Sequence, residues 1–161
     1  MKLRDLMIKN VITVSPDGTI TAAAQIMRVH RIGCLVVTAN TRVRGILTDR
    51  DLLACLAAAH DPRQCTAAIH MTASVVVDRP DEELIRAAEK MAQMQIKRLP
   101  IVEDNRLAGL ISFSDIADLV SEQWQEVWWT LAPLTRYIRA QSVHRRGREP
   151  RLVKPELPKS T

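Results

Sequence analysis

The chain has 161 residues, 47% of them hydrophobic, a length that suits one compact domain or one domain with a tail. The longest apolar run, Leu52 to Ala59, is far too short to span a membrane. The first residues lack the apolar stretch of a secretion signal, and the three cysteines show no metal-ligand spacing. We therefore expect free thiols in the reducing environment of the cytoplasm.

The net charge of +5 is unevenly distributed along the chain. Eight basic and two acidic residues follow residue 135, so this last segment carries +6 and the preceding residues carry −1. The basic character belongs to the tail. The nearly neutral body gives no electrostatic reason to expect nucleic-acid binding.

The body matches itself without a gap at a shift of 64 residues. Two copies of this length are typical of a duplicated supersecondary unit rather than of a solenoid array. Each copy alone would bury too little surface to be stable, so we expect a shared core. The identical pairs include Met7 and Met71, Pro16 and Pro80, Asp17 and Asp81, Met27 and Met91, Gly45 and Gly109, and Asp51 and Asp115.

Each repeat is predicted to contain a strand, a helix, two strands and a second helix. In the first repeat we place these at residues 11–14, 19–27, 34–37, 43–47 and 48–59, with Thr19 as a helix cap and a turn at 40–42. In the second repeat they are a strand at 75–77, a helix from Asp81, strands at 99–102 and 107–111, and a last helix. An apolar stripe extends that helix towards Pro133.

The segment after the repeats has its own character. A second short helix is expected over 134–143, followed by a flexible Arg- and Pro-rich tail from His144. Packing on the body or on a dimer partner and recognition of another protein are both open roles for Trp124, Trp128 and Trp129. Trp residues and the basic cluster together could also touch an anionic membrane surface, and the tail could contact nucleic acid.

The most informative local motif runs from Gly45 to Asp51 and recurs from Gly109 to Asp115. It reads glycine, two apolar residues, Thr or Ser, two variable residues and Asp, where a strand ends and a helix begins. The glycine allows close approach to the backbone, and the free amides of the helix start attract an anion. A capping box, which needs no ligand, explains the same hydroxyl and carboxylate.

The order of elements, the Pro-Asp segments after the first strands, the Arg98 to Val102 run and the two Gly-x-x-Thr/Ser-x-x-Asp motifs resemble a tandem pair of CBS (cystathionine-β-synthase-type) domains. The resemblance covers about residues 1–122. It implies a mixed α/β (α+β) fold of two βαββα repeats related by a pseudo-two-fold axis, with a C-terminal helical extension and basic tail. The predicted divisions are 1–60, 66–122 and 123–161.

The resemblance also implies a regulatory, signal-transducing module. One or both clefts would bind an adenosine-containing ligand such as AMP, ADP, ATP or S-adenosylmethionine, with no obligatory cofactor. Thr48, Arg50 and Asp51 would hold phosphate and ribose in one cleft, and Ser112 and Asp115 in the other. The base pockets would be lined by Ile12, Thr13, Leu35 and Val36 in one cleft, and by Val76, Val77, Leu99 and Pro100 in the other. Arg98 supplies a phosphate partner that its counterpart Cys34 cannot.

The resemblance implies a homodimer, for which Leu52, Leu53 and Leu56, with Ile116, Leu119 and Val120, are the candidate faces. No catalytic constellation is recognised, and we do not expect an enzyme. His60 and His70 are expected to stand without a cluster of metal ligands around them. The alternative function is a dimerisation or interaction scaffold with empty clefts, or a nucleic-acid binder acting through the tail.

Overall fold

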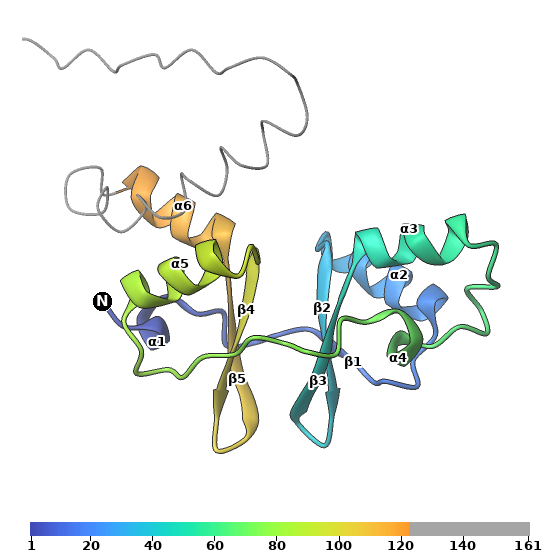
Figure 1. The fold of residues 1–161 in the computed structure, drawn as a ribbon, viewed down its shortest axis with the longest axis horizontal. Helices are drawn as coiled ribbons and strands as arrows, with labels where there is room; N and C mark the ends of the chain where they lie inside the picture. Colours follow the sequence, from blue (N-terminus) through green and yellow to red (C-terminus); the bar gives the residue numbers. More distant parts are fainter. Residues whose placement is uncertain (123–161) are drawn as a thin grey trace, which may run out of the picture.

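The computed structural model describes residues 1–122, which form two units of similar build standing side by side (Figure 1). Each unit places helices against a small sheet. In chain order the elements are α1 (Leu3–Leu6), β1 (Thr13–Val14), α2 (Ile20–His30), β2 (Cys34–Ala39), β3 (Arg42–Thr48), α3 (Asp49–Ala57), α4 (Ala67–His70), α5 (Leu84–Gln93), β4 (Arg98–Glu103), β5 (Arg106–Ser112) and α6 (Phe113–Glu122). The predicted mixed α/β class is confirmed.

Each unit is built around an antiparallel hairpin. Strand β2 pairs with β3 in the first unit, and β4 pairs with β5 in the second. Both hairpins close through two residues with positive φ, at Asn40 and Thr41 and again at Asp104 and Asn105. Such two-residue turns match the right-handed twist of the strands they join. The turn predicted at residues 40–42 is therefore confirmed.

The first strand of each repeat is shorter than predicted. In the first unit only Thr13 and Val14 pair with β2, in parallel. The predicted strand at 75–77 is wrong, because the second unit has only an isolated bridge between Asp78 and Ile101. That bridge uses both backbone groups of Asp78, whose N–H donates to the Pro100 carbonyl while its carbonyl accepts from the Val102 N–H. A single paired residue makes no strand.

The helices begin in different ways, some with a side-chain cap and some without. Thr19 accepts a hydrogen bond from the Ala22 N–H at 3.1 Å, which confirms its predicted capping role in α2. Helix α5 begins at Leu84 rather than at Asp81, because the Pro80 and Glu82 carbonyls accept hydrogen bonds from the Arg4 and Leu3 N–H groups of α1. Helix α6 is described to Glu122, so the extension towards Pro133 and the three tryptophans lie outside the described residues. Within the described part, no helix has the length and apolar character needed to cross a membrane.

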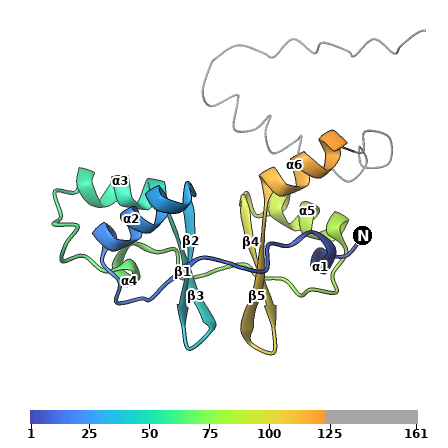
Figure 2. The same cartoon turned by 180° about the vertical axis from the view of Figure 1, so that it is seen from behind.

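Each of the short helices α1 and α4 packs against the unit that is formed mainly by the other repeat. Leu3 of α1 is fully buried among Leu84, Met91 and other core residues of the second unit. Helix α4, its counterpart in the second repeat, packs on the first unit, and its Ala67 N–H donates to the Gly18 carbonyl at 2.7 Å. The two connecting segments consequently cross between the units in both views (Figures 1 and 2).

The two repeated glycines lie where these crossing segments pass the central strands. Ile46 forms a bridge with Thr72, and Leu110 forms the equivalent bridge with Ile8. A Cβ atom on Gly109 would lie 2.6 Å from Met7 Sδ and 3.1 Å from the Ile8 carbonyl oxygen. A Cβ on Gly45 would meet Met71 Sδ and Thr72 in the same way. The glycines therefore do allow a close approach, but it is the approach of the other repeat's chain.

A candidate ligand cleft between the two units

The hydroxyl and carboxylate of the repeated motif cap helices. Asp51 Oδ2 accepts hydrogen bonds from the backbone N–H and the hydroxyl of Thr48, both at 2.7 Å. In the second unit Asp115 Oδ2 accepts from the Ser112 N–H at 2.6 Å and from its hydroxyl at 2.8 Å. The capping interpretation is thus confirmed at both helix starts. Among residues 1–122, however, Asp51 Oδ1 receives no hydrogen bond and is left available to a ligand.

A cleft of about 560 Å³ opens at the start of α3, within the size range of small-molecule sites. It is formed by both repeats. The first repeat contributes Gly33, Cys34, Ile46, Thr48, Asp49, Arg50 and Asp51. The second contributes the crossing segment with Thr72, Ser74, Val75 and Val76, and the start of β4 with Gln95, Ile96, Lys97 and Arg98. A ligand here would contact both units at once.

The lining combines opposite charges with an apolar wall. Arg50, Lys97 and Arg98 supply three cations, and Asp49 and Asp51 supply two carboxylates. The amino end of α3 adds the partial positive charge of its dipole. Cys34 lines the same cleft, close to these charged groups. Burial raises the pKa of its thiol to about 11, against the opposing effect of Arg98, so the thiol is neutral at physiological pH.

Five predicted binding residues line this cleft together, namely Thr48, Arg50, Asp51, Val76 and Arg98. The sequence did not predict that Val76 and Arg98 of the second repeat meet Thr48 and Asp51 of the first repeat in one cleft. The reason is the crossing of the segments between the units, which places the 72–76 segment beside β3. Local sequence patterns carry no information about that exchange.

Three predicted residues have side chains that are buried in the interior rather than lining the cleft. Leu35, Val36 and Leu99 are each 0% exposed, and Leu35 and Leu99 belong to the two hydrophobic cores. Pro100 is also buried, and its carbonyl is already paired with the Asp78 N–H. Continuous apolar strands are covered on both faces, so the central residues of β2 and β4 point into packed interior rather than into a cleft.

The remaining predicted residues lie elsewhere. Ile12 packs against the first core, and Thr13 is the half-buried start of β1. Ser112 is 7% exposed and, with Asp115, caps α6. Val77 points into a second cavity, separate from the cleft that contains its neighbour Val76.

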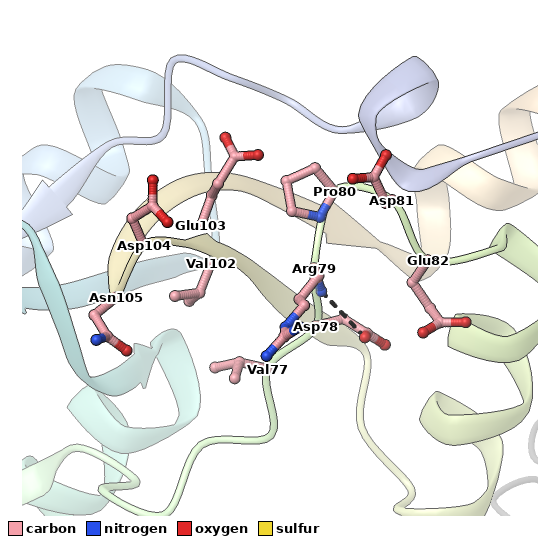
Figure 3. A pocket seen from close by; sticks show the side chains of 10 residues that line it. All are labelled: Val77, Asp78, Arg79, Pro80, Asp81, Glu82, Val102, Glu103, Asp104 and Asn105. Atoms are coloured by element: carbon pink, nitrogen blue, oxygen red, sulfur yellow. Dashed lines mark hydrogen bonds between the residues drawn. The ribbon is translucent and has the colours of Figure 1, made fainter.

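This second cavity, of about 790 Å³, is larger but has the wrong charge for a phosphate (Figure 3). Its walls are the 77–82 segment and the end of the β4–β5 hairpin. Its lining contains five carboxylates and one cation, Arg79, although Asp78 is paired with Lys90 and Asp81 with Arg4 and Lys2. The other three carboxylates still outnumber Arg79, so the smaller cleft at α3, with its three cations, is the better candidate for a nucleotide. The acidic side chains are Asp78, Asp81, Glu82, Glu103 and Asp104.

Sequence reasoning missed several residues of the α3 cleft. Asp49, Thr72 and Ser74 line it although none was expected to bind. The signal available for Thr72 and Ser74 was their position just after α4, where hydroxyl residues replace Ile8 and Asn10 of the first repeat. A further group was also missed: Cys55, His60, Cys65 and His70 come together in space, contrary to the expectation that His60 and His70 stand alone.

Comparison with known proteins agrees with this architecture. The model of the CBS domain family matches residues 3–58 and 67–122. The protein is 37% identical over 115 residues to the CBS domain-containing protein YhcV of Bacillus subtilis, covering 71% of this chain and 82% of that one. It is 36% identical over 116 residues to hypoxic response protein 1 of Mycobacterium tuberculosis, covering 71% and 81%.

Solved structures give the same result. The crystal structure of hypoxic response protein I, with two coordinated zinc ions, superposes with a TM-score of 0.67 and 36% identity over 73% of this chain and 98% of that chain. The CBS domain pair of protein MJ0100, in complex with 5′-methylthioadenosine and S-adenosyl-L-methionine, gives a TM-score of 0.70 at 28% identity over 76% and 98%. With two matched copies, the exchanged helices and the cleft between them, the chain belongs to the CBS domain family as a tandem pair.

Proposed function

We propose that the protein is a regulatory module that binds an adenosine-containing ligand in the cleft at the start of α3. The observation that carries the proposal is the composition of this cleft. Ile46, Val75 and Val76 offer an apolar wall for a base, and Asp51 offers a carboxylate oxygen for the ribose hydroxyls. Lys97 and Arg98 offer cations for phosphate. In support, the similar CBS pair of MJ0100 holds two adenosine-containing ligands.

The proposed mechanism is a change in how the two units sit together. A ligand that contacts Thr48 and Asp51 in one repeat and Arg98 in the other binds best to the arrangement in which these groups are closest. It then shifts the population towards that arrangement by its difference in affinity. The protein would act through binding alone, without catalysis, and alter the contacts of a regulated partner.

The second predicted cleft is less suited to the same ligand. By the 64-residue shift, Ser114 stands there in place of Arg50, and Phe113 in place of Asp49. We therefore propose one principal site for each chain and leave binding at Ser112 and Asp115 as the two-site alternative. An interaction scaffold with empty clefts is the competing function. The tryptophans and basic tail on which a partner or nucleic-acid role depends lie outside the described residues.

Thermal unfolding with a ligand panel tests the proposal. AMP, ADP, ATP, S-adenosylmethionine and 5′-methylthioadenosine are each added at concentrations well above their expected Kd. At about 100 times Kd a ligand adds about 2.7 kcal/mol to the free energy of unfolding, which raises Tm by several degrees. At least one member should do so. A folded sample that responds to none of them would favour the empty scaffold.

We further propose that the protein is a homodimer through the exposed face of α3. Leu53 and Leu56 are 65% and 57% exposed, and residues three apart share one helix face. Two other predicted interface residues are not available to a partner in the same way: Leu52 packs against the first core, and its counterpart Ile116 is 0% exposed in the second core.

Sedimentation analysis tests the dimer directly. The double variant Leu53→Glu/Leu56→Glu should sediment as a monomer at concentrations where the wild type is a dimer, because charged groups would have to be desolvated in the interface. Ile8→Glu, which changes an exposed residue outside α3, should leave the dimer intact. A monomeric wild type at high concentration contradicts this part of the proposal.

A further inference from the structure

Four potential metal ligands gather at the junction between the two repeats, away from the ligand cleft. Cys55 lies in α3, His60 and Cys65 lie in the connection, and His70 is the last residue of α4. One donor atom from each residue, a thiol sulfur or an imidazole nitrogen, lies within 4.8 Å of each of the other three. In the sequence they recur at every fifth position, a spacing that neither a helix nor a strand would bring together.

Backbone hydrogen bonds fix this connection in place. The His60 N–H donates to the Cys55 carbonyl at 3.2 Å, and the Cys65 N–H donates to the Asp61 carbonyl at 3.0 Å. The Cys65 carbonyl in turn accepts from the Ile20 N–H at 2.9 Å, which ties the segment to α2. These backbone contacts hold the connection that carries His60 and Cys65 against the first unit.

The burial of the donors points to a ligand. Cys55 is fully buried and Cys65 is half-buried. The Nε2 atom of His70 is buried and has no hydrogen-bond partner within residues 1–122. A buried polar atom without a partner costs free energy, and such atoms are rare in native proteins. A bound cation nearby would account for this cluster, in which the His60 ring also lies 5.6 Å from that of His70.

The donor set selects the kind of cation. Two thiolates and two imidazoles are the ligands of tetrahedral structural zinc sites. With bonds of about 2.3 Å to sulfur and about 2.0 Å to nitrogen, ligands on a tetrahedron lie roughly 3.3–3.8 Å apart. The donor atoms lie within 4.8 Å of one another, so their separations need to shorten by at most about 1.5 Å.

We propose that Cys55, His60, Cys65 and His70 bind one Zn²⁺ ion in a closed, structural site. On binding, the two thiols become thiolates and release two protons to solvent, while both imidazoles bind as neutral groups; no electron is transferred. Four protein ligands leave no open position, so the ion is not catalytic. It joins the carboxyl end of α3 to α4, just before the segment that forms one wall of the ligand cleft.

The site belongs to the first unit alone. At the shift of 64 residues Cys55 corresponds to Leu119, which packs against the apolar core of the second unit. The zinc proposal is independent of the proposed nucleotide site, since the two sites share no lining residue. An experiment can therefore contradict one proposal without contradicting the other.

Metal analysis of the full chain tests this inference. The protein is purified without added metal or affinity histidines, its zinc content is measured by mass spectrometry, and the reduced apoprotein is titrated with Zn²⁺ against a chromophoric chelator. We expect one equivalent for each chain. Co²⁺ in place of Zn²⁺ should give the intense visible absorption of a tetrahedral ion and a thiolate charge-transfer band.

Matched variants separate ligation from folding. His60 is exposed, so His60→Asn should fold normally, yet its zinc affinity should fall by about 100-fold or more, above the effect of losing an outer-shell partner. Cys65→Ser should strongly reduce the intensity of the Co²⁺ charge-transfer band, because one of the two thiolate ligands is lost. His30→Asn and Cys34→Ser change the same residue types outside the cluster and should bind zinc like the wild type. A reduced, folded wild type that binds zinc no more tightly than His60→Asn overturns the inference, as does a Co²⁺ complex without thiolate absorption.

Discussion

Replacing Lys90 by Met should lower the free energy of unfolding by about 3 kcal/mol, because it leaves the carboxylate of Asp78 buried without its partner. Lys90 Nζ lies 2.6 Å from Asp78 Oδ2, and the Asp78 side chain is only 6% exposed. The Lys90 side chain is 37% exposed, which places the expected cost at the lower end for a broken buried pair. Urea unfolding monitored by circular dichroism measures it.

The repeat itself supplies the control for this prediction. The counterparts of Asp78 and Lys90 are Val14 and Ile26, and both belong to the apolar core of the first unit. The double variant Asp78→Val/Lys90→Ile introduces the apolar pair of the first repeat. Its free energy of unfolding should be within about 1 kcal/mol of the wild-type value or higher than it. Lys2→Met breaks an exposed pair with Asp81 and should change stability by less than about 0.5 kcal/mol. A Lys90→Met protein as stable as the Lys2→Met protein contradicts this account.

A valine at Gly109 should destabilise the protein by about 3 kcal/mol through overpacking. Even the first carbon of the new side chain would lie 2.6 Å from Met7 Sδ and 3.1 Å from the Ile8 carbonyl oxygen. The methionine side chain can move, but the carbonyl belongs to the bridge between Ile8 and Leu110 and cannot. Thermal or urea unfolding of Gly109→Val against the wild type measures the loss.

A double-mutant cycle identifies the cause. Met7→Ala removes the nearer obstacle, so Met7→Ala/Gly109→Val should be more stable than the sum of the two single effects predicts. The rescue should be partial, because the Ile8 carbonyl remains. Strict additivity would show that Gly109 does not meet Met7, and hence that the first segment of the chain does not complete the second unit.

The sequence predicts well those features that short-range chemistry decides. Thr19 and Thr48 cap helices as expected, and the Asn40–Thr41 turn closes its hairpin. The duplication predicted the class of fold, because two equal patterns of strands and helices indicate two units of the same build. The expected shared core is wrong: each unit has its own core, which a short helix from the other repeat completes through Leu3 or Ala67. Helix α5 was placed too early because Asp81 could serve equally well in a first turn or in an ion pair with Arg4.

The site was only half predictable, because its two halves meet through contacts distant in the sequence. Local motif and charge were enough to single out Thr48, Asp51 and Arg98 as candidate binding residues, and all three line the proposed cleft. That these residues line one cleft depends on the crossing segments, which bring the 72–76 segment beside β3 through the bridge between Ile46 and Thr72. The proposed zinc ligands were not predicted from the sequence for a related reason. Their regular spacing matches neither helical nor strand periodicity, and only the irregular connection after α3 brings them together.

The central claim is that one ligand bridges the two repeats at the start of α3, and calorimetric titration of matched cap variants tests it most directly. Asp51→Ala and Asp115→Ala each remove one equivalent capping box, at a similar cost of about 1 kcal/mol in stability. The panel member with the largest thermal shift should bind wild type and Asp115→Ala alike, with one site for each chain. Its affinity for Asp51→Ala, and for Arg98→Ala from the opposite repeat, should fall by about 10- to 100-fold. Equal affinity for Asp51→Ala and Asp115→Ala, or full binding by Arg98→Ala, would contradict the account.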